Sequence, residues 1–89
     1  MVDAESEIVN RLGLHARAAA KLVQMASSFE SEVYLVSDAE EVDAKSILGI
    51  LLLAAAQGMR VTVRCSGIDE LAALEAVTRL IADGFGEEG

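Results

Sequence analysis

The segment from Ser46 to Ala56 constrains the fold of this chain most strongly, because it is apolar almost throughout. It contains one serine, one glycine and nine apolar residues. Since Ser46 is a preferred N-cap residue, the segment predicts a helix from Ser46 to Gln57 that ends at Gly58. A chain of 89 residues cannot cover every face of such a helix, because a domain of this size leaves roughly 35–40% of its unfolded surface in water. Contiguous exposed apolar surface is typical of a docking face, and the segment is too short to span a bilayer, which takes about 20 residues.

The composition predicts one domain, residues 1–89, in a cytoplasmic setting. With 53% hydrophobic and 25% charged residues, the chain has the balance of a globular protein. Cys65 is the single cysteine, and the first seven residues carry three acids and no basic residue, unlike a secretory leader. These features predict a reducing, cytoplasmic compartment, and no segment is long enough to predict a transmembrane helix.

The distribution of charge along the chain indicates possible partners. The net charge of −8 disfavours nucleic acid as a partner. All fifteen acids lie outside two windows, residues 8–29 and 44–68. The basic residues in these windows are Arg11, Arg17, Lys21, Lys45, Arg60 and Arg64. Two such positive islands predict local anion binding or an acidic docking partner, with chance clustering as the alternative.

Periodicity and turn residues predict four strands and three helices in the order βαββαβα. The predicted strands cover residues 7–12, 33–37, 40–44 and 60–66, and the predicted helices cover 16–29, 46–57 and the stretch from Asp69 to Gly84. The last helix is expected to place Leu71, Leu74, Val77, Thr78 and Ile81 on one face, and Gly86–Gly89 to form a frayed acidic tail. We expect an α+β open-faced β-sandwich: a four-stranded antiparallel sheet with three helices on one face and Arg60, Thr62 and Arg64 on the solvated face.

The chain's single histidine lies at a predicted strand-to-helix junction. Gly13 permits an unusual turn, which places His15 at or near the N-cap and makes Ala16 the first helical residue. The free amides of a helix N-terminus favour an anion there, and Arg17 adds a fork of donors. These residues predict a covalent phosphoryl site with His15 as the nucleophile; the alternative is a polar junction residue. A metal site is disfavoured, because one His and one Cys supply too few ligands.

Two motifs at a characteristic spacing carry a family resemblance. The first is Gly13-Leu14-His15-Ala16-Arg17, and the second is Lys45-Ser46-Ile47-Leu48-Gly49, followed by Gln57-Gly58. Together they resemble the HPr family, the histidine-containing phosphocarriers of the bacterial phosphotransferase system. The resemblance covers nearly the whole chain, and the pair of motifs is far more specific than either motif alone.

The resemblance implies a relay function without a cofactor. His15 would accept a phosphoryl group on its δ nitrogen from phosphorylated Enzyme I and pass it to an Enzyme IIA domain. Arg17 and the backbone amides of Ala16 and Arg17 would hold that group. Ser46 matches the serine modified by HPr kinase/phosphorylase, and a transcriptional regulator is a further implied partner. The residues expected to dock partners are Lys21, Ile47, Leu48 and Leu51, and the carrier is expected to be a monomer.

One departure from the family pattern leaves alternatives open. Ala18 stands where the family often has proline, and the chain contains no proline. Alanine is a good helix former, so activity is expected to remain intact. The first alternative is the nitrogen-related paralogue, NPr, whose relay is regulatory. A second is a purely regulatory binding module that acts through the surface around Ser46 with a dormant His15. A third, a stand-alone hydrolase, has little support because no second histidine and no nearby acid accompany His15 in the sequence.

Overall fold

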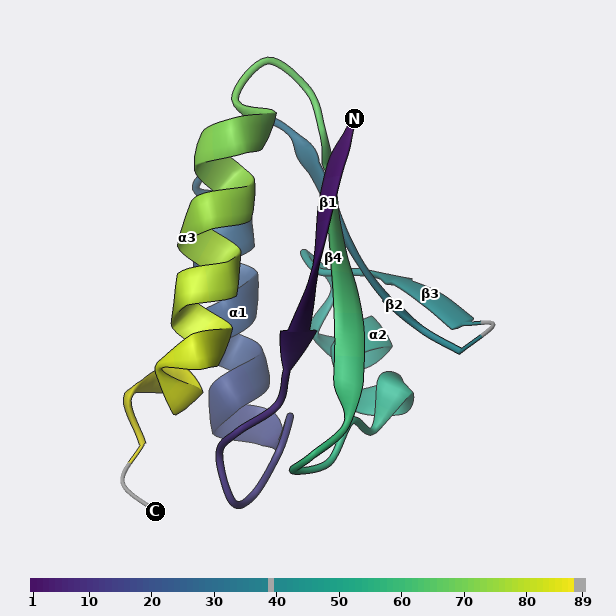
Figure 1. Ribbon diagram of the computed structural model, residues 1–89, viewed down its shortest axis with the longest axis vertical. Coiled ribbons are helices and arrows are strands. Elements are labelled where there is room, and N and C mark those ends of the chain that lie inside the picture. The colour runs from purple at the N-terminus through teal and green to yellow at the C-terminus, as the bar shows by residue number, and fades with distance from the viewer. Residues whose placement is uncertain (39, 88–89) are drawn as a thin grey trace.

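The computed structural model describes residues 1–38 and 40–87, which form a four-stranded sheet with three helices (Figure 1). The elements are β1 (Val2–Glu7), α1 (Ala16–Ser27), β2 (Glu32–Ser37), β3 (Glu40–Asp43), α2 (Ile47–Leu53), β4 (Arg60–Ser66), α3 (Glu70–Ala82) and the short 3-10 turn η1 (Gly84–Gly86). The strands pair antiparallel in the order β1-β4-β2-β3. The predicted class and element order are therefore confirmed.

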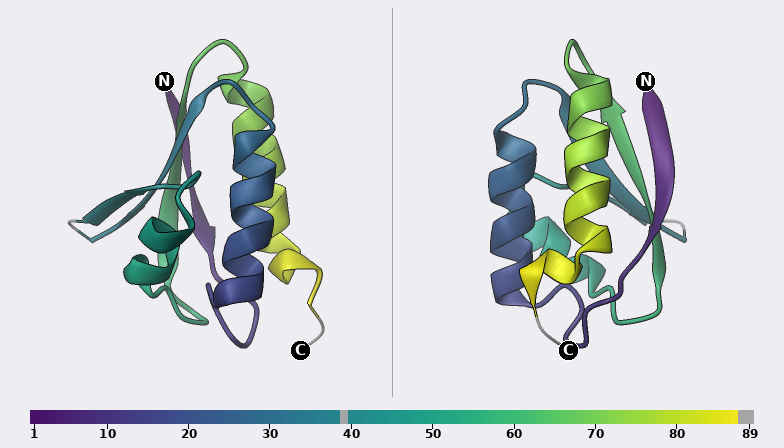
Figure 2. Two further views of the ribbon diagram at one scale, coloured as in Figure 1. Left: turned by 180° about the vertical axis from the view of Figure 1, so that it is seen from behind. Right: turned by 60° about the vertical axis from the view of Figure 1, so that its left-hand side comes forward.

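The core lies between the sheet and the helices. Along β4, Val61, Val63 and Cys65 are buried while the residues between them are not, and β2 buries Val33 and Leu35 in the same way. This period of two is what a sheet with one covered face requires. Helices α1 and α3 lie side by side over the covered face, and α2 packs beside the lower half of α1 and against β3 (Figures 1 and 2).

The uncovered sheet face corrects one charge prediction. Arg60 lies on this face and pairs with Glu5 at 2.8 Å, and Arg64 pairs with Glu41 at 2.8 Å. These two arginines come from the second acid-free window, but the sheet places them opposite acids from other strands. The second positive island predicted from the sequence therefore does not form. Lys45, the third basic residue of that window, donates to the Phe29 carbonyl oxygen at 2.9 Å.

The first strand lies earlier than predicted. We expected it over residues 7–12, but β1 covers Val2–Glu7, and the chain after it forms a loop. Half-buried positions alternate with exposed acids in β1, and the inward residues are too small to give a strong hydrophobic signal. Ile8 is fully buried in the loop, where its backbone pairs with Met59 and Gly58 at 2.9 and 2.8 Å. No local pattern reveals this tertiary pairing with the residues before β4.

The apolar helix is shorter than predicted. Helix α2 ends at Leu53, and Ala54 takes a left-handed conformation with φ of 54° as the C-cap. The expected end at Gly58 is wrong, because the segment after Ala54 pairs with the N-terminal loop instead. Ala55 accepts a hydrogen bond from Leu14 N–H at 2.9 Å, and Gly58 N–H donates to Ile8. No helix among the described residues is long and apolar enough to cross a membrane.

The buried side of α3 is also rotated from the predicted face. Ala73, Val77 and Ile81, spaced by four residues, are fully buried. Leu71, expected on the same face, is 71% exposed. Two residues correspond to about 200° around a helix, so Leu71 and Ala73 lie on opposite sides. Ala73 is a small residue, so its hydrophobicity alone did not predict that it lies on the buried face.

Candidate functional site

His15 occupies the N-cap of α1, as the sequence predicts. Its backbone is extended, and its side chain makes no capping hydrogen bond. The first bond of this helix runs from Ala19 N–H to the His15 carbonyl at 2.8 Å. The amides of residues 16–18 therefore have no partner in the helix, which is the general property of helix N-termini that attracts anions.

The loop that presents His15 is attached to the segment after α2. Gly13 has a φ of +63°, and a Cβ there would lie 2.5 Å from the Ala55 carbonyl oxygen. Only glycine fits this close approach, and the adjacent Leu14 N–H bonds to the same oxygen. As a result, the start of α1 and helix α2 lie at the same end of the molecule (Figure 2).

The imidazole of His15 contacts an acid that sequence reasoning did not find. His15 Nε2 lies 2.5 Å from Glu87 Oε2, and the two side chains are 27% and 14% exposed. The hydrogen bond from His15, and to a lesser extent the one from Asn10, holds the pKa of Glu87 below its usual range. The expectation of a frayed tail is therefore wrong for Glu87, while residues 88 and 89 lie outside the described residues. Seventy-two positions separate His15 from Glu87, so only folding reveals the pair.

Contacts with the body of the protein hold the C-terminal segment in place. Phe85 is almost fully buried, although it has a left-handed backbone conformation with φ of 58°. The Phe85 carbonyl accepts a hydrogen bond from Lys21 Nζ at 2.6 Å. Lys21, expected to face docking partners, is half-buried, and its ammonium group binds the protein's own chain. The sequence contains no signal for this contact.

Arg17 remains available for an external anion. It is exposed in the first turn of α1, and it forms no ion pair with any described residue. A cation at a helix N-terminus opposes the helix dipole, so this position does not stabilise α1. Together with the free amides at the start of the helix, Arg17 makes a positively polarised surface beside His15.

Ser46 caps α2 as predicted, with Oγ accepting a hydrogen bond from Gly49 N–H at 3.1 Å. The helix behind it buries Ile50 and Leu53 and exposes its other apolar residues. The exposed fractions are 46% for Ile47, 63% for Leu48, 39% for Leu51 and 70% for Leu52. We call these four residues the α2 patch. The predicted excess of apolar surface is therefore present, and Leu52 belongs to it in addition to the three predicted docking residues.

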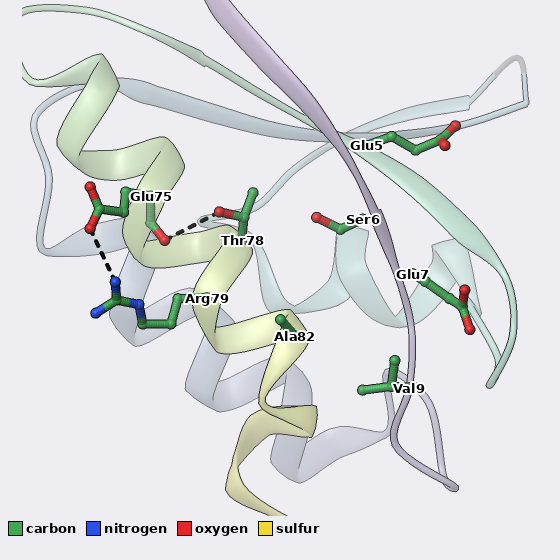
Figure 3. Close-up of a pocket in the computed structure, with 8 residues that line it drawn as sticks. All are labelled: Glu5, Ser6, Glu7, Val9, Glu75, Thr78, Arg79 and Ala82. Carbon is green, nitrogen blue, oxygen red and sulfur yellow. Dashed lines mark hydrogen bonds and ion pairs between the residues drawn. The ribbon is translucent and has the colours of Figure 1, made fainter.

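A groove elsewhere on the molecule contains none of the predicted site residues. It has a volume of about 600 Å³ and lies between β1 and α3 (Figure 3). Its lining residues are Glu5, Ser6, Glu7, Val9, Glu75, Thr78, Arg79 and Ala82. Within it, Arg79 pairs with Glu75 at 3.3 Å. The predicted site is a partly exposed surface around His15, separate from this groove.

Comparisons with known proteins agree with this fold. The family model described as "PTS HPr component phosphorylation site" matches residues 2–83. The phosphocarrier protein HPr of Cupriavidus necator is 48% identical over 87 residues, which covers 98% of both chains. The phosphocarrier protein NPr of Escherichia coli is 41% identical over 83 residues, 92% of each chain.

Solved structures of relatives have the same fold as this chain. HPr-C-His from Thermoanaerobacter tengcongensis superimposes with a TM-score of 0.96, is 45% identical and covers all of both chains. An HPr dimer from the same organism gives a TM-score of 0.78 at 45% identity, over 98% of this chain and 100% of the other. The chain therefore belongs to the HPr family of phosphocarrier proteins of the phosphotransferase system, whose members are relay proteins rather than stand-alone enzymes.

Proposed function

We propose that His15 receives a phosphoryl group from phosphorylated Enzyme I and passes it to an Enzyme IIA domain. The observation that carries this proposal is a partly exposed histidine at a helix N-terminus, with unpaired amides and an exposed Arg17 beside it. A relay must meet two proteins in turn, so its reacting atom has to lie near the surface. Membership of a phosphocarrier family supports the same conclusion.

The proposed chemistry is an in-line transfer to His15 Nδ1. The lone pair of His15 Nδ1 attacks phosphorus, and the bond from phosphorus to the donor atom breaks with its electron pair remaining on the donor. Charge spreads over the three phosphoryl oxygens in such a transition state. The amides of Ala16 and Arg17 and the Arg17 guanidinium would stabilise that charge. Transfer to Enzyme IIA reverses these roles, and Nδ1 leaves with its pair.

The test is incubation with Enzyme I and phosphoenolpyruvate, followed by intact-mass measurement. We expect one added phosphate that is lost in acid, as a phosphorus–nitrogen bond requires. The control is a carrier already known to accept phosphate from the same Enzyme I preparation. If the control is phosphorylated and this chain is not, the relay proposal fails and the regulatory binding module becomes the better explanation.

The α2 patch is the proposed docking surface for Enzyme I and Enzyme IIA. Exchanging Ile47 for glutamate should weaken binding of an Enzyme IIA domain by about 10-fold or more, because central apolar contacts dominate interface energies. Calorimetric titration measures this affinity. Leu71→Glu is the matched control, since it places the same charge on an exposed leucine of a different helix. Equal affinity of Ile47→Glu and wild type would remove the α2 patch from the interface.

Ser46 is the proposed site of regulatory phosphorylation. Its half-buried hydroxyl caps α2, and a phosphate dianion is favourable at that helix end. It would also place negative charge beside the α2 patch and weaken docking to an acidic partner. We expect HPr kinase to add phosphate to the wild type but not to Ser46→Ala, as read by intact mass. Ser28→Ala, at an exposed serine, is the control, and equal incorporation into Ser46→Ala would exclude Ser46.

The remaining proposals concern setting and assembly. We propose one cytoplasmic domain that works as a monomer, although a relative forms a dimer. A transcriptional regulator is a further candidate partner for the Ser46 surface. The NPr-type role has no advantage over the HPr role, because the E. coli NPr is less similar to this chain than the C. necator HPr. Binding assays against sugar-specific and nitrogen-related Enzyme IIA domains distinguish the two.

A further inference from the structure

We propose that Glu87 is a positioning residue for His15, because its carboxylate keeps the ring proton on Nε2 and leaves the lone pair on Nδ1 for attack. The proposal extends to Asn10, which holds the carboxylate in place. It rests on the proposed function, since the benefit of a fixed lone pair is phosphoryl transfer. The C-terminal segment, which looked like a loose tail in the sequence, would then be part of the reacting centre.

The His15–Glu87 contact determines which ring nitrogen carries the proton. Glu87 Oε2 lies 2.5 Å from His15 Nε2, and a carboxylate of lowered pKa is an acceptor only. Nε2 must therefore donate, and in a neutral imidazole the other nitrogen then holds the lone pair. His15 Nδ1 does not cap α1, so its lone pair accepts no hydrogen bond from an amide of the helix.

Asn10 orients Glu87 from inside the protein. Its side chain is only 3% exposed, and its amide nitrogen donates to Gly13 O at 2.7 Å and to Glu87 Oε1 at 3.1 Å. Both partners are acceptors, so the reversed amide would bring its oxygen against two other oxygens. The Asn10 Oδ1 atom is buried without a partner among the described residues. The orientation that leaves Oδ1 unpaired is therefore the one that holds both the His15 loop and Glu87.

The C-terminal segment is anchored well enough to make this contact specific. Phe85 is 1% exposed and lies in the core, and its carbonyl oxygen accepts a hydrogen bond from the Lys21 ammonium group at 2.6 Å. Glu87 N–H donates to Gly84 O at 3.1 Å, which fixes the direction of the chain two residues after Phe85. Buried anchoring on one side and Asn10 on the other restrict the positions that the Glu87 carboxylate can take.

The carboxylate also suits the charge that transfer creates. When Nδ1 forms its bond to phosphorus while Nε2 keeps its proton, the neutral ring becomes a phosphorylated imidazolium. A carboxylate hydrogen-bonded to the far nitrogen of an imidazole stabilises this cation without removing its proton. When the group moves on, the phosphorus–Nδ1 bond breaks, the pair returns to Nδ1, and the proton remains on Nε2. Glu87 thus acts through His15 in both directions.

The test compares the wild type with Glu87→Gln and Glu87→Ala. Glutamine keeps the size but has no charge, and its amide can either accept from a protonated Nε2 or donate to an unprotonated one, so it no longer selects one tautomer. We expect phosphate uptake from phosphorylated Enzyme I to slow by about 10-fold in both variants. Residues that orient a reacting group from behind typically contribute about 10–100-fold, and the partial exposure of His15 and Glu87 favours the lower value. Nitrogen NMR of the His15 ring should show the Nε2-protonated tautomer in the wild type and a mixture in Glu87→Gln.

Glu75→Gln is the matched control, since Glu75 is an exposed acid that pairs with Arg79 away from His15. It should change neither the rate nor the tautomer. An unchanged transfer rate in both Glu87 variants would overturn the proposal, and so would an unchanged tautomer in Glu87→Gln. If the wild type takes up no phosphate at all, the proposed function itself fails, and the NMR comparison still reports separately whether Glu87 sets the ring proton.

Discussion

Replacing His15 with alanine should abolish phosphate uptake from phosphorylated Enzyme I while the protein remains folded. The reason for the loss is that alanine has no nucleophilic nitrogen, and the chain contains no second histidine. The fold should survive because the His15 side chain is partly exposed and caps no amide of α1. Intact-mass measurement after incubation with Enzyme I and phosphoenolpyruvate gives the result directly.

The control for this experiment is the secondary structure of the variant. Circular dichroism should superimpose on that of the wild type, and heating should give a single cooperative transition. Phosphate uptake by His15→Ala at the wild-type rate would show that the acceptor is another residue. Unfolding of the variant would instead mean that the contact between His15 and Glu87 is needed for folding.

Arg17→Ala should slow phosphoryl transfer by about 30-fold, the second-largest effect on activity that we expect. Removing one donor to an oxygen that develops charge in the transition state costs about 2.7–4 kcal/mol of barrier. Arg17 is exposed to solvent, which weakens its electrostatic contribution, so we expect a loss below that range, about 2 kcal/mol. Rapid-quench kinetics with phosphorylated Enzyme I measures the rate.

Arg11→Ala is the matched control for Arg17, because Arg11 is an exposed arginine of the same acid-free window that lies in the loop before His15. Its rate should stay close to that of the wild type if position rather than net charge matters. Arg17→Lys should recover part of the rate, since lysine keeps the charge but lacks the planar fork of donors. A rate within twofold of the wild type for Arg17→Ala would show that Arg17 is incidental.

Local chemical signals explain why much of the site was predictable. A serine before an apolar run and a histidine after Gly13-Leu14 are helix-start patterns, and the structure places both residues at N-caps. The excess of apolar surface on α2 followed from chain length, because a domain of this size has too little protein to cover it. These inferences needed only the residues within one turn of each helix start and the size of the chain.

Several of the features that the sequence did not predict depend on contacts between distant segments. Helix α2 ends early because Ala55 pairs with Leu14 in the N-terminal loop. Arg60 and Arg64 do not form a positive surface because the sheet brings Glu5 of β1 to Arg60 and Glu41 of β3 to Arg64. Neither effect is encoded in a local pattern, because each partner lies at least twenty residues away.

The composition and motif spacing of this chain were sufficient to establish its α+β class, its element order, the place of His15 and the exposed character of α2. Periodicity and capping residues are properties of short segments, and chain length is a property of the whole chain, so all three can be evaluated without coordinates. Folding alone brought Glu87 into contact with the His15 ring and with Asn10, and it brought the Lys21 ammonium to the Phe85 carbonyl. Their physical basis is hydrogen bonding between segments at opposite ends of the chain, which exists only after the core has packed.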